Sequence, residues 1–153
     1  MEVKNTKDLL DETDLLILDL LNHDGRLSNK ELADKIGLTA TPTSLRVRKL
    51  EEDGFILGYQ ARLNKKRIGK GLQVQCHIRL KDHSSESIAC FEREVQTLSD
   101  VTSCYHIAGD FDYMLWVEVR DMDAYHSFLR ETLSQIEYIG NVHSDFVMHT
   151  VKE

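Results

Sequence analysis

Residues 28–54 read SNKELADKIGLTATPTSLRVRKLEEDG, and this stretch decides the fold of the first half of the chain. Ser28 stands three residues before Glu31, which is the spacing of a capping box, where two side chains satisfy the free amides of a helix start. Apolar residues at helical spacing follow, and Gly37 supplies a stop. The pattern therefore predicts a short helix that begins at Ser28 and ends at Gly37.

A further helix is predicted directly after this stop. Thr39 is a suitable N-cap residue, Pro42 falls in the first turn, where its missing N–H costs little, and Gly54 marks the end. The segment Phe55 to Leu63 that follows has an extended pattern and is interpreted as a wing or linker.

The sequence before residue 28 predicts one more helix. Leucines at helical spacing run from Asp11 to His23, and Asp24-Gly25 predicts a stop at which the glycine adopts the left-handed conformation. Residues 1–10 carry no firm period and are treated as a frayed arm or a short extra helix. Three short helices with a glycine between the second and third match the helix-turn-helix plan, in which the third helix enters the major groove of DNA.

The third helix is expected to have one buried and one outward face. Helical spacing assigns the buried stripe to Ala40, Thr43, Val47 and Leu50. Arg46 is a candidate for a bidentate contact to guanine, and Arg48 and Lys49 for contacts to phosphates. Leu45 also faces outward by this spacing. Including Thr43 despite its place in the stripe, the predicted DNA-binding residues are Thr41, Thr43, Ser44, Arg46, Arg48 and Lys49. Alternatively, the basic side chains form a solvated face that pairs with residues 51–53.

The charge of the chain is distributed unevenly. The formal net charge is −7, which by itself argues against a nucleic-acid partner. Residues 1–70 hold 13 basic and 12 acidic side chains, whereas residues 71–153 hold 6 and 14. Between Thr39 and Lys70 eight basic residues stand against three acidic ones, so this stretch is the candidate phosphate-facing surface.

The second half has the order strand, helix, strand, strand, helix, strand. Strands are predicted over 72–81, 101–108, 111–119 and 138–151, and helices over 84–98 and 122–135. This order is that of a ferredoxin-like βαββαβ fold, with both helices on one face of an antiparallel sheet. The chain is thus predicted as α+β, with a (winged) helix-turn-helix domain over 1–63, a basic linker over 64–71 and a ferredoxin-like domain over 72–153.

Several motifs recur along the chain in a characteristic order: Asp24-Gly25-Arg26, Glu31-Leu32-Ala33, Gly54-Phe55-Ile56 and above all Gly109-Asp110-Phe111-Asp112-Tyr113. Together they resemble the Lrp/AsnC family of leucine- and asparagine-responsive regulators. The resemblance covers about residues 11–152. It implies a sequence-specific regulator that binds double-stranded DNA, with a C-terminal RAM domain that forms homodimers through its sheets. It further implies that dimers assemble into a higher oligomer, an octamer in the common case, with an amino-acid effector bound between neighbouring dimers.

The Gly109–Asp112 turn is the candidate effector site. Glycine permits unusual backbone conformations there, and exposed amides can hold a carboxylate. Asp110 or Asp112 could hold the ammonium group, and Ser144 matches a polar position that the resemblance places at the effector pocket. The predicted effector-binding residues are Gly109, Asp110, Phe111, Asp112 and Ser144. Alternatively, the turn is a plain hairpin whose aspartates cap their own amides.

Other classes of protein receive little support. The chain has no apolar stretch of membrane-spanning length, and residues 1–5 lack the apolar core of a signal peptide, so a cytoplasmic protein is expected. Three widely spaced cysteines indicate no disulfide framework, and seven scattered histidines no metal site, although alternation could bring His77 and His106 close. No cofactor is expected. The rival hypotheses are an enzyme similar to the sirohaem decarboxylases, which would use His106 and His143, and an architectural DNA-binding protein without an effector.

Overall fold

The computed structural model describes residues 10–152, and the predicted arm or extra helix over 1–10 lies almost wholly outside that range. The chain divides into two compact units, one up to Arg62 and one from Leu63 onward. Within residues 10–152, no helix is long and apolar enough to cross a membrane.

The N-terminal unit consists of three helices around a small apolar core. They are α1 (Glu12–His23), α2 (Asn29–Ile36) and α3 (Ala40–Glu52). The capping box at Ser28 is confirmed, since the Glu31 amide donates to Ser28 Oγ and the Glu31 carboxylate accepts from the Ser28 amide. The core side chains are Ile17, Leu21, Leu32, Val47 and Leu50. This arrangement confirms the helix-turn-helix prediction.

Glycines end two of these helices, but not the first. Gly37 and Gly54 adopt φ of 71° and 75°. Because they have no Cβ, they can take this left-handed conformation, which ends α2 and α3. The predicted left-handed Gly25 is wrong. α1 ends instead at His23, and its C-cap residue Asp24 has extended backbone angles and accepts a hydrogen bond from the Arg26 amide. A Cβ on Gly25 would lie 3.4 Å from the Tyr59 ring, so this glycine lies against Tyr59.

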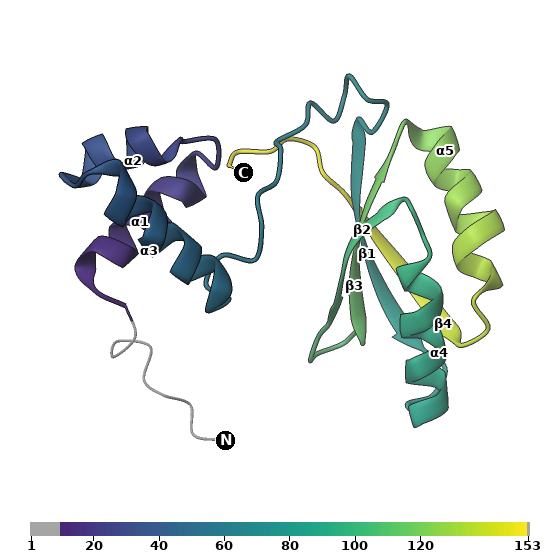
Figure 1. Cartoon of the computed structure of the whole chain (residues 1–153). Coiled ribbons are helices and arrows are strands. Elements are labelled where there is room, and N and C mark those ends of the chain that lie inside the picture. The colour runs from purple at the N-terminus through teal and green to yellow at the C-terminus, as the bar shows by residue number, and fades with distance from the viewer. Residues whose placement is uncertain (1–9, 153) are drawn as a thin grey trace. The chain divides into compact units, whose positions relative to one another are not determined.

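The C-terminal unit is an antiparallel sheet covered by helices on one face (Figure 1). Its elements are β1 (Leu72–Leu80), α4 (Ser85–Gln96), β2 (Val101–His106), β3 (Tyr113–Val119), α5 (Met122–Ser127) and β4 (Ile139–Phe146). The strand order β2-β3-β1-β4 is ferredoxin-like, which confirms the predicted fold class. After α5 the predicted helix continues as a π-helical turn, Phe128–Thr132, and a 3-10 turn, Leu133–Gln135. Because a π turn aligns residues five apart, Phe128 and Leu133 both reach the core.

Alternation along the strands separates a core face from a second face. On β1 the side chains of Val74, Cys76, Ile78 and Leu80 are buried against the helices. The opposite face, here called the open face, is formed by Gln73, Gln75, His77, Arg79, Met114, Trp116, Glu118, Asn141, His143 and Asp145.

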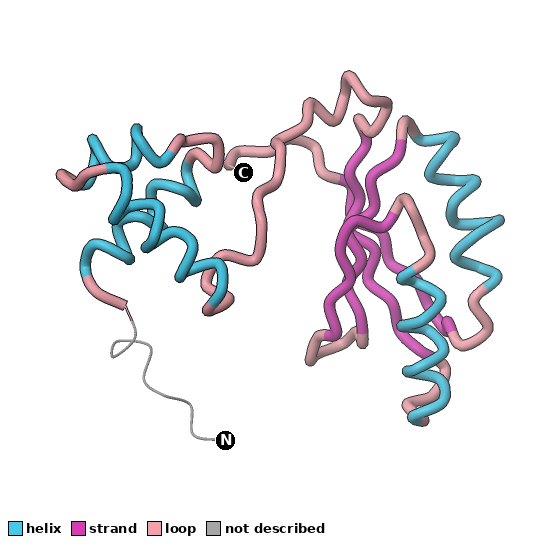
Figure 2. The backbone as a smooth tube through the Cα atoms, viewed as in Figure 1, coloured by secondary structure: helices cyan, strands magenta, loops and turns pink. Residues whose placement is uncertain are grey.

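The connection between α3 and β1 consists of two segments. Residues 55–63 run without helix or strand, as Figure 2 shows by their loop colour. The basic stretch 64–71, predicted as a linker, packs as a turn within the C-terminal unit. Lys65 explains this, because its Nζ lies 2.7 Å from Oε2 of the buried Glu118 on the open face.

Candidate DNA-binding surface and effector site

Helix α3 packs against the core of the N-terminal unit through most of the predicted stripe, and its other residues face away from that core. Thr43, Val47 and Leu50 are buried, whereas Ala40, at the first position of the helix, is exposed. The side chain of Thr43 is fully buried and its Oγ1 donates to the Thr39 carbonyl at 2.9 Å. The inclusion of Thr43 among the DNA contacts is therefore corrected. Its hydroxyl completes the first turn of α3, where Thr39 makes no side-chain cap.

The outward face of α3 holds the other candidates in a row. Thr41 and Lys49 are exposed and Ser44 is half-buried. Leu45 lies among them with 64% of its surface exposed, so the core does not account for this leucine. An exposed leucine within a polar helix face can contact a thymine methyl group.

Arg48 and Arg46 differ in the carboxylates with which they pair. Arg48 Nε donates to Glu52 at 2.7 Å one helical turn later, and both side chains are mostly exposed. Such surface pairs contribute little and exchange readily for phosphate. The predicted pairing of basic side chains with the end of α3 thus occurs for Arg48.

Arg46 instead joins α3 to the start of α1. Its Nη1 lies 2.7 Å from a carboxylate oxygen of Asp11 and 2.7 Å from one of Asp14, the two residues that cap α1. The Asp14 amide and the Arg46 guanidinium together hold the pKa of Asp11 below its ordinary value. This geometry does not favour the predicted guanine contact, because the guanidinium is already engaged within the domain.

The predicted effector turn is fixed to the neighbouring strand. Gly109 has φ of 146°, and the Asp112 amide donates to the Ile78 carbonyl at 2.9 Å. Arg79 donates from Nε, at 2.9 Å, and from Nη2 to the carbonyl oxygen of Asp110. The same guanidinium lies 5.6 Å from the centre of the Phe111 ring. Arg79 therefore holds the turn from the open face.

The two aspartates of the turn have different surroundings. Asp112 accepts from the Leu80 amide and from His83 Nε2, each at 2.8 Å. Although burial raises the pKa of Asp112, these two hydrogen bonds lower it below its ordinary value. Among residues 10–152, no side chain or amide bonds to the exposed Asp110 carboxylate. The amides of Gly109, Asp110 and Phe111 likewise make no hydrogen bond to the described residues.

Ser144 is not brought together with this turn. It pairs with Cys76 in the sheet register and points to the core face, where its Oγ lies 2.5 Å from Tyr125 Oη. Tyr125 Oη also lies 3.0 Å from Cys76 Sγ. The three side chains form a polar cluster under α5, whereas the turn meets β1 at Ile78 and beyond.

The histidines do not assemble into a centre. His77 and His143 each approach Asp145 at 3.3 Å on the open face, and His106 stacks on Tyr113 on the core face, so His77 and His106 lie on opposite faces. Among residues 10–152, no group of three histidine, cysteine or acidic side chains is placed to hold a metal ion.

Comparison with known proteins gives one result for both units. The family model of the winged helix-turn-helix DNA-binding domain matches residues 10–56, and that of the Lrp/AsnC ligand-binding domain matches residues 73–153. The chain is 42% identical to the Bkd operon transcriptional regulator of Pseudomonas aeruginosa over 142 residues, which is 93% of each chain. It is 40% identical to the leucine-responsive regulatory protein of Escherichia coli over 94% of this chain and 88% of that one.

The chain belongs to the Lrp/AsnC family.

Solved Lrp/AsnC structures agree with this assignment. A transcriptional regulator of Neisseria meningitidis, in complex with L-methionine, aligns with a TM-score of 0.91 at 30% identity over 94% of this chain and 93% of that chain. An AsnC family regulator of Agrobacterium tumefaciens aligns with a TM-score of 0.89 at 36% identity over 94% of each chain. The chain is thus a DNA-binding transcriptional regulator of the Lrp/AsnC type, and the enzyme hypothesis is set aside because the family consists of regulators.

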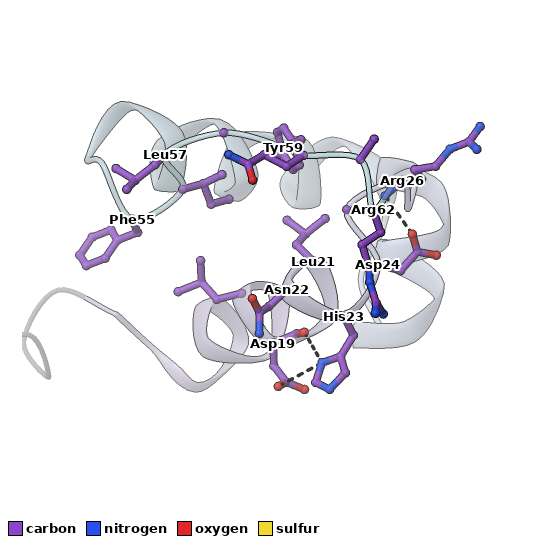
Figure 3. A pocket seen from close by; sticks show the side chains of 16 residues that line it. Asp19, Leu21, Asn22, His23, Asp24, Arg26, Phe55, Leu57, Tyr59 and Arg62 are labelled. Carbon is purple, nitrogen blue, oxygen red and sulfur yellow. Dashed lines mark hydrogen bonds and ion pairs between the residues drawn. The ribbon is translucent and has the colours of Figure 1, made fainter. Parts of the chain in front are cut away.

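Two parts of this Lrp/AsnC protein were not predicted from the sequence. Arg79 and His83, which hold the turn, are ordinary polar residues until the register of β1 against the turn is known. A hollow of about 1070 Å³ in the N-terminal unit was also not expected. Figure 3 shows it between the second half of α1 and the segment Phe55–Arg62, with Leu21 and Tyr59 lining it. Tyr59 Oη donates to Glu51 at 2.8 Å and so ties this segment to α3.

Proposed function

We propose that this Lrp/AsnC regulator reads DNA with α3 and that an amino acid, bound at the Gly109–Asp112 turn between dimers, modulates its DNA binding or assembly. The observation that carries the effector site is the turn itself. Arg79 fixes it, while its free amides and the exposed Asp110 carboxylate are left without partners among the described residues. An α-amino acid offers the matching pair of groups, a carboxylate for the amides and an ammonium for Asp110.

The relatives support an amino acid as the class of effector. One similar structure is named as a complex with L-methionine, and one relative is named leucine-responsive. The side-chain selectivity of this chain is a separate question, since the turn supplies only groups for the shared α-amino-acid part. Asp112 and Phe111 serve this site by shaping the turn, because the Asp112 carboxylate is engaged with Leu80 and His83.

Ligand binding to the full-length protein tests the effector site. Calorimetry with each proteinogenic amino acid should detect at least one ligand for the wild type. Asp110→Asn should abolish that binding, whereas Asp123→Asn, a matched change of an exposed aspartate on α5, should retain it. Binding that survives in Asp110→Asn would contradict the location. No binding of any amino acid to the wild type would contradict the effector and favour the architectural hypothesis.

The DNA contacts are proposed at the exposed residues of α3. Thr41, Ser44 and Leu45 would meet base edges, and Arg48 and Lys49 would hold phosphates. Arg46 would act on DNA binding indirectly, through its ion pairs with Asp11 and Asp14, here called the α1–α3 clamp.

Fragment binding distinguishes these roles. Leu45→Ala should reduce the preference for a selected genomic fragment over random DNA, whereas Lys49→Ala should weaken both. Lys30→Ala on α2 also removes one exposed lysine and is the charge-matched control for Lys49→Ala. If Arg46→Ala lowered the preference without lowering the melting temperature, the guanine contact would be right and the clamp account wrong.

The assembly is proposed to form through the open face. This face is uncovered by helices in Figure 1 and carries the partly accessible side chains of Met114 and Trp116. The partly accessible ring of Phe111 lies beside it, with its centre 5.3 Å from that of the His77 ring. A second copy would cover it, and such dimers would associate further, to an octamer in the form that the family resemblance implies. Light scattering after size exclusion should give a dimer or an even multiple of it. A monomer at micromolar concentration would contradict this part of the proposal.

A further inference from the structure

The turn Asn64–Gly71 concentrates positive charge on an otherwise acidic unit. From residue 71 onward the chain holds 6 basic against 14 acidic side chains, whereas the turn contains Lys65, Lys66, Arg67 and Lys70 and no acidic residue. The turn follows the loop that leaves α3, as Figure 2 shows. A basic cluster of this kind is a candidate contact for an acidic partner.

The backbone of the turn is well defined. Both the side-chain and the main-chain oxygen of Asn64 accept from the Arg67 amide, at 3.1 and 3.0 Å. The Lys70 amide donates to the Lys65 carbonyl at 2.8 Å, and Gly69 closes the turn with φ of 77°. These bonds fix the backbone of the turn and thus the positions from which its side chains start.

Two of the four basic side chains anchor the turn to its own unit. Lys65 pairs with the buried carboxylate of Glu118, at 2.7 Å. Lys70 Nζ donates to the Ser99 carbonyl at 3.1 Å. These two cations are thus used inside the protein and add little to the outer surface.

The other two basic side chains point outward without partners. Lys66 and Arg67 are exposed, and within residues 10–152 neither side chain makes a hydrogen bond or ion pair. This differs from α3, where Arg46 and Arg48 both have carboxylate partners. Lys66 and Arg67 are adjacent in the sequence. Both can therefore contact an anion without first losing a bond inside the protein.

The chain length between α3 and the turn limits where that anion can lie. Eleven residues, 55–65, lie between Gly54 and Lys66. A chain of that length spans at most roughly 40 Å. One helical turn of B-DNA is about 34 Å long. This upper limit includes the phosphates beside the major groove in which α3 lies, although the hydrogen bond from Tyr59 to Glu51 makes the actual reach shorter.

We propose that Lys66 and Arg67 form a second, sequence-independent contact to the backbone phosphates of the duplex that α3 reads. The anchored turn presents two free cations, and DNA is the polyanion that the same chain already binds. The contact deepens the proposed function and rests on DNA binding through α3. It assigns to the C-terminal unit a direct part in holding DNA.

The test is the salt dependence of DNA binding by the full-length protein. The probe is a random-sequence duplex several helical turns long, titrated at a series of salt concentrations. Each lost phosphate contact reduces the slope of log affinity against log salt by about 0.9. The double variant Lys66→Ala/Arg67→Ala should therefore reduce the slope by about 2 per bound chain and weaken binding roughly 10- to 100-fold at 0.1 M salt. Preference for a selected fragment over random DNA should not change.

A matched variant controls for net charge. Arg93→Ala/Arg130→Ala removes two exposed cations from the helical side of the same unit and should leave the slope unchanged. An unaltered slope in the Lys66/Arg67 variant, or an equal change in both variants, would overturn the proposal while DNA binding through α3 stands. A change in oligomeric state with an unaltered slope would assign the pair to an acidic surface of a second copy and would also overturn it. If the wild type itself bound no DNA, the role of α3 would fail first.

Discussion

Replacement of Lys65 by methionine should destabilise the C-terminal unit by removing the cation beside a buried carboxylate. The side chain of Glu118 is only 4% exposed, and Lys65 Nζ lies 2.7 Å from its Oε2. The remaining neighbour of that carboxylate is Gln73, whose Nε2 lies 3.4 Å from Oε1. Methionine has a similar length but no charge, so Glu118 would keep its buried charge and lose its main partner.

The magnitude follows from the burial of the two partners. Removal of one partner from a fully buried ion pair costs about 3–5 kcal/mol. The Lys65 side chain is 38% exposed, so solvent already screens the ammonium and the expected loss falls to about 1–3 kcal/mol. For a unit of about this size, such a loss lowers the melting temperature by roughly 5–15 °C.

Trp116 makes this measurement specific. It is the single tryptophan of the chain and lies on β3, so its fluorescence during urea unfolding reports on the C-terminal unit. All variants are compared at one protein concentration, because assembly also affects stability. The double variant Lys65→Met/Glu118→Gln should recover at least half of the loss, since no buried charge remains. A loss below about 0.5 kcal/mol in Lys65→Met, or no recovery in the double variant, would refute the reasoning.

Three further predictions concern single residues. Gly37→Ala should cost about 1–2 kcal/mol, because a residue with a Cβ adopts φ of 71° unfavourably, and helical circular dichroism should show the lower melting temperature. The hydroxyls of Ser87 and Ser84 lower the pKa of Asp82 to about 2. Because this pKa is depressed, its stabilising effect is complete above about pH 5 and is lost as the pH falls toward 2, so Asp82→Asn should flatten the acid limb of the stability profile. Ser144→Ala should lower stability by about 1 kcal/mol through the Tyr125 hydroxyl. It should leave amino-acid binding unchanged, and loss of that binding would return Ser144 to the effector site.

Local rules account for the part of the fold that the sequence predicted. The capping box of Ser28 and Glu31 and the stop at Gly37 depend on residues within one or two helical turns, so their structure follows from spacing alone. Gly25 shows the limit of such rules. Its neighbour in space is Tyr59, which a local pattern cannot place, and the expected left-handed stop did not form.

The candidate sites were harder to predict because their side chains have distant partners. Arg46 belongs to the outward face of α3 by its spacing, yet Asp11 and Asp14 hold it from another helix. Ser144 and the Gly109–Asp112 turn are both polar features of the C-terminal half. Only the pairing of Ser144 with Cys76 shows that they belong to different regions of the sheet.

This single chain is expected both to bind DNA and to respond to an amino acid. Genomic DNA fragments bound by the full-length protein should be selected and sequenced twice, with and without a mixture of the proteinogenic amino acids. We predict that a defined set of fragments is enriched, that the mixture changes the set or its occupancy, and that Asp110→Asn retains the enrichment but loses the change. An identical set under both conditions for the wild type would contradict the claim, and so would the absence of any enriched fragment.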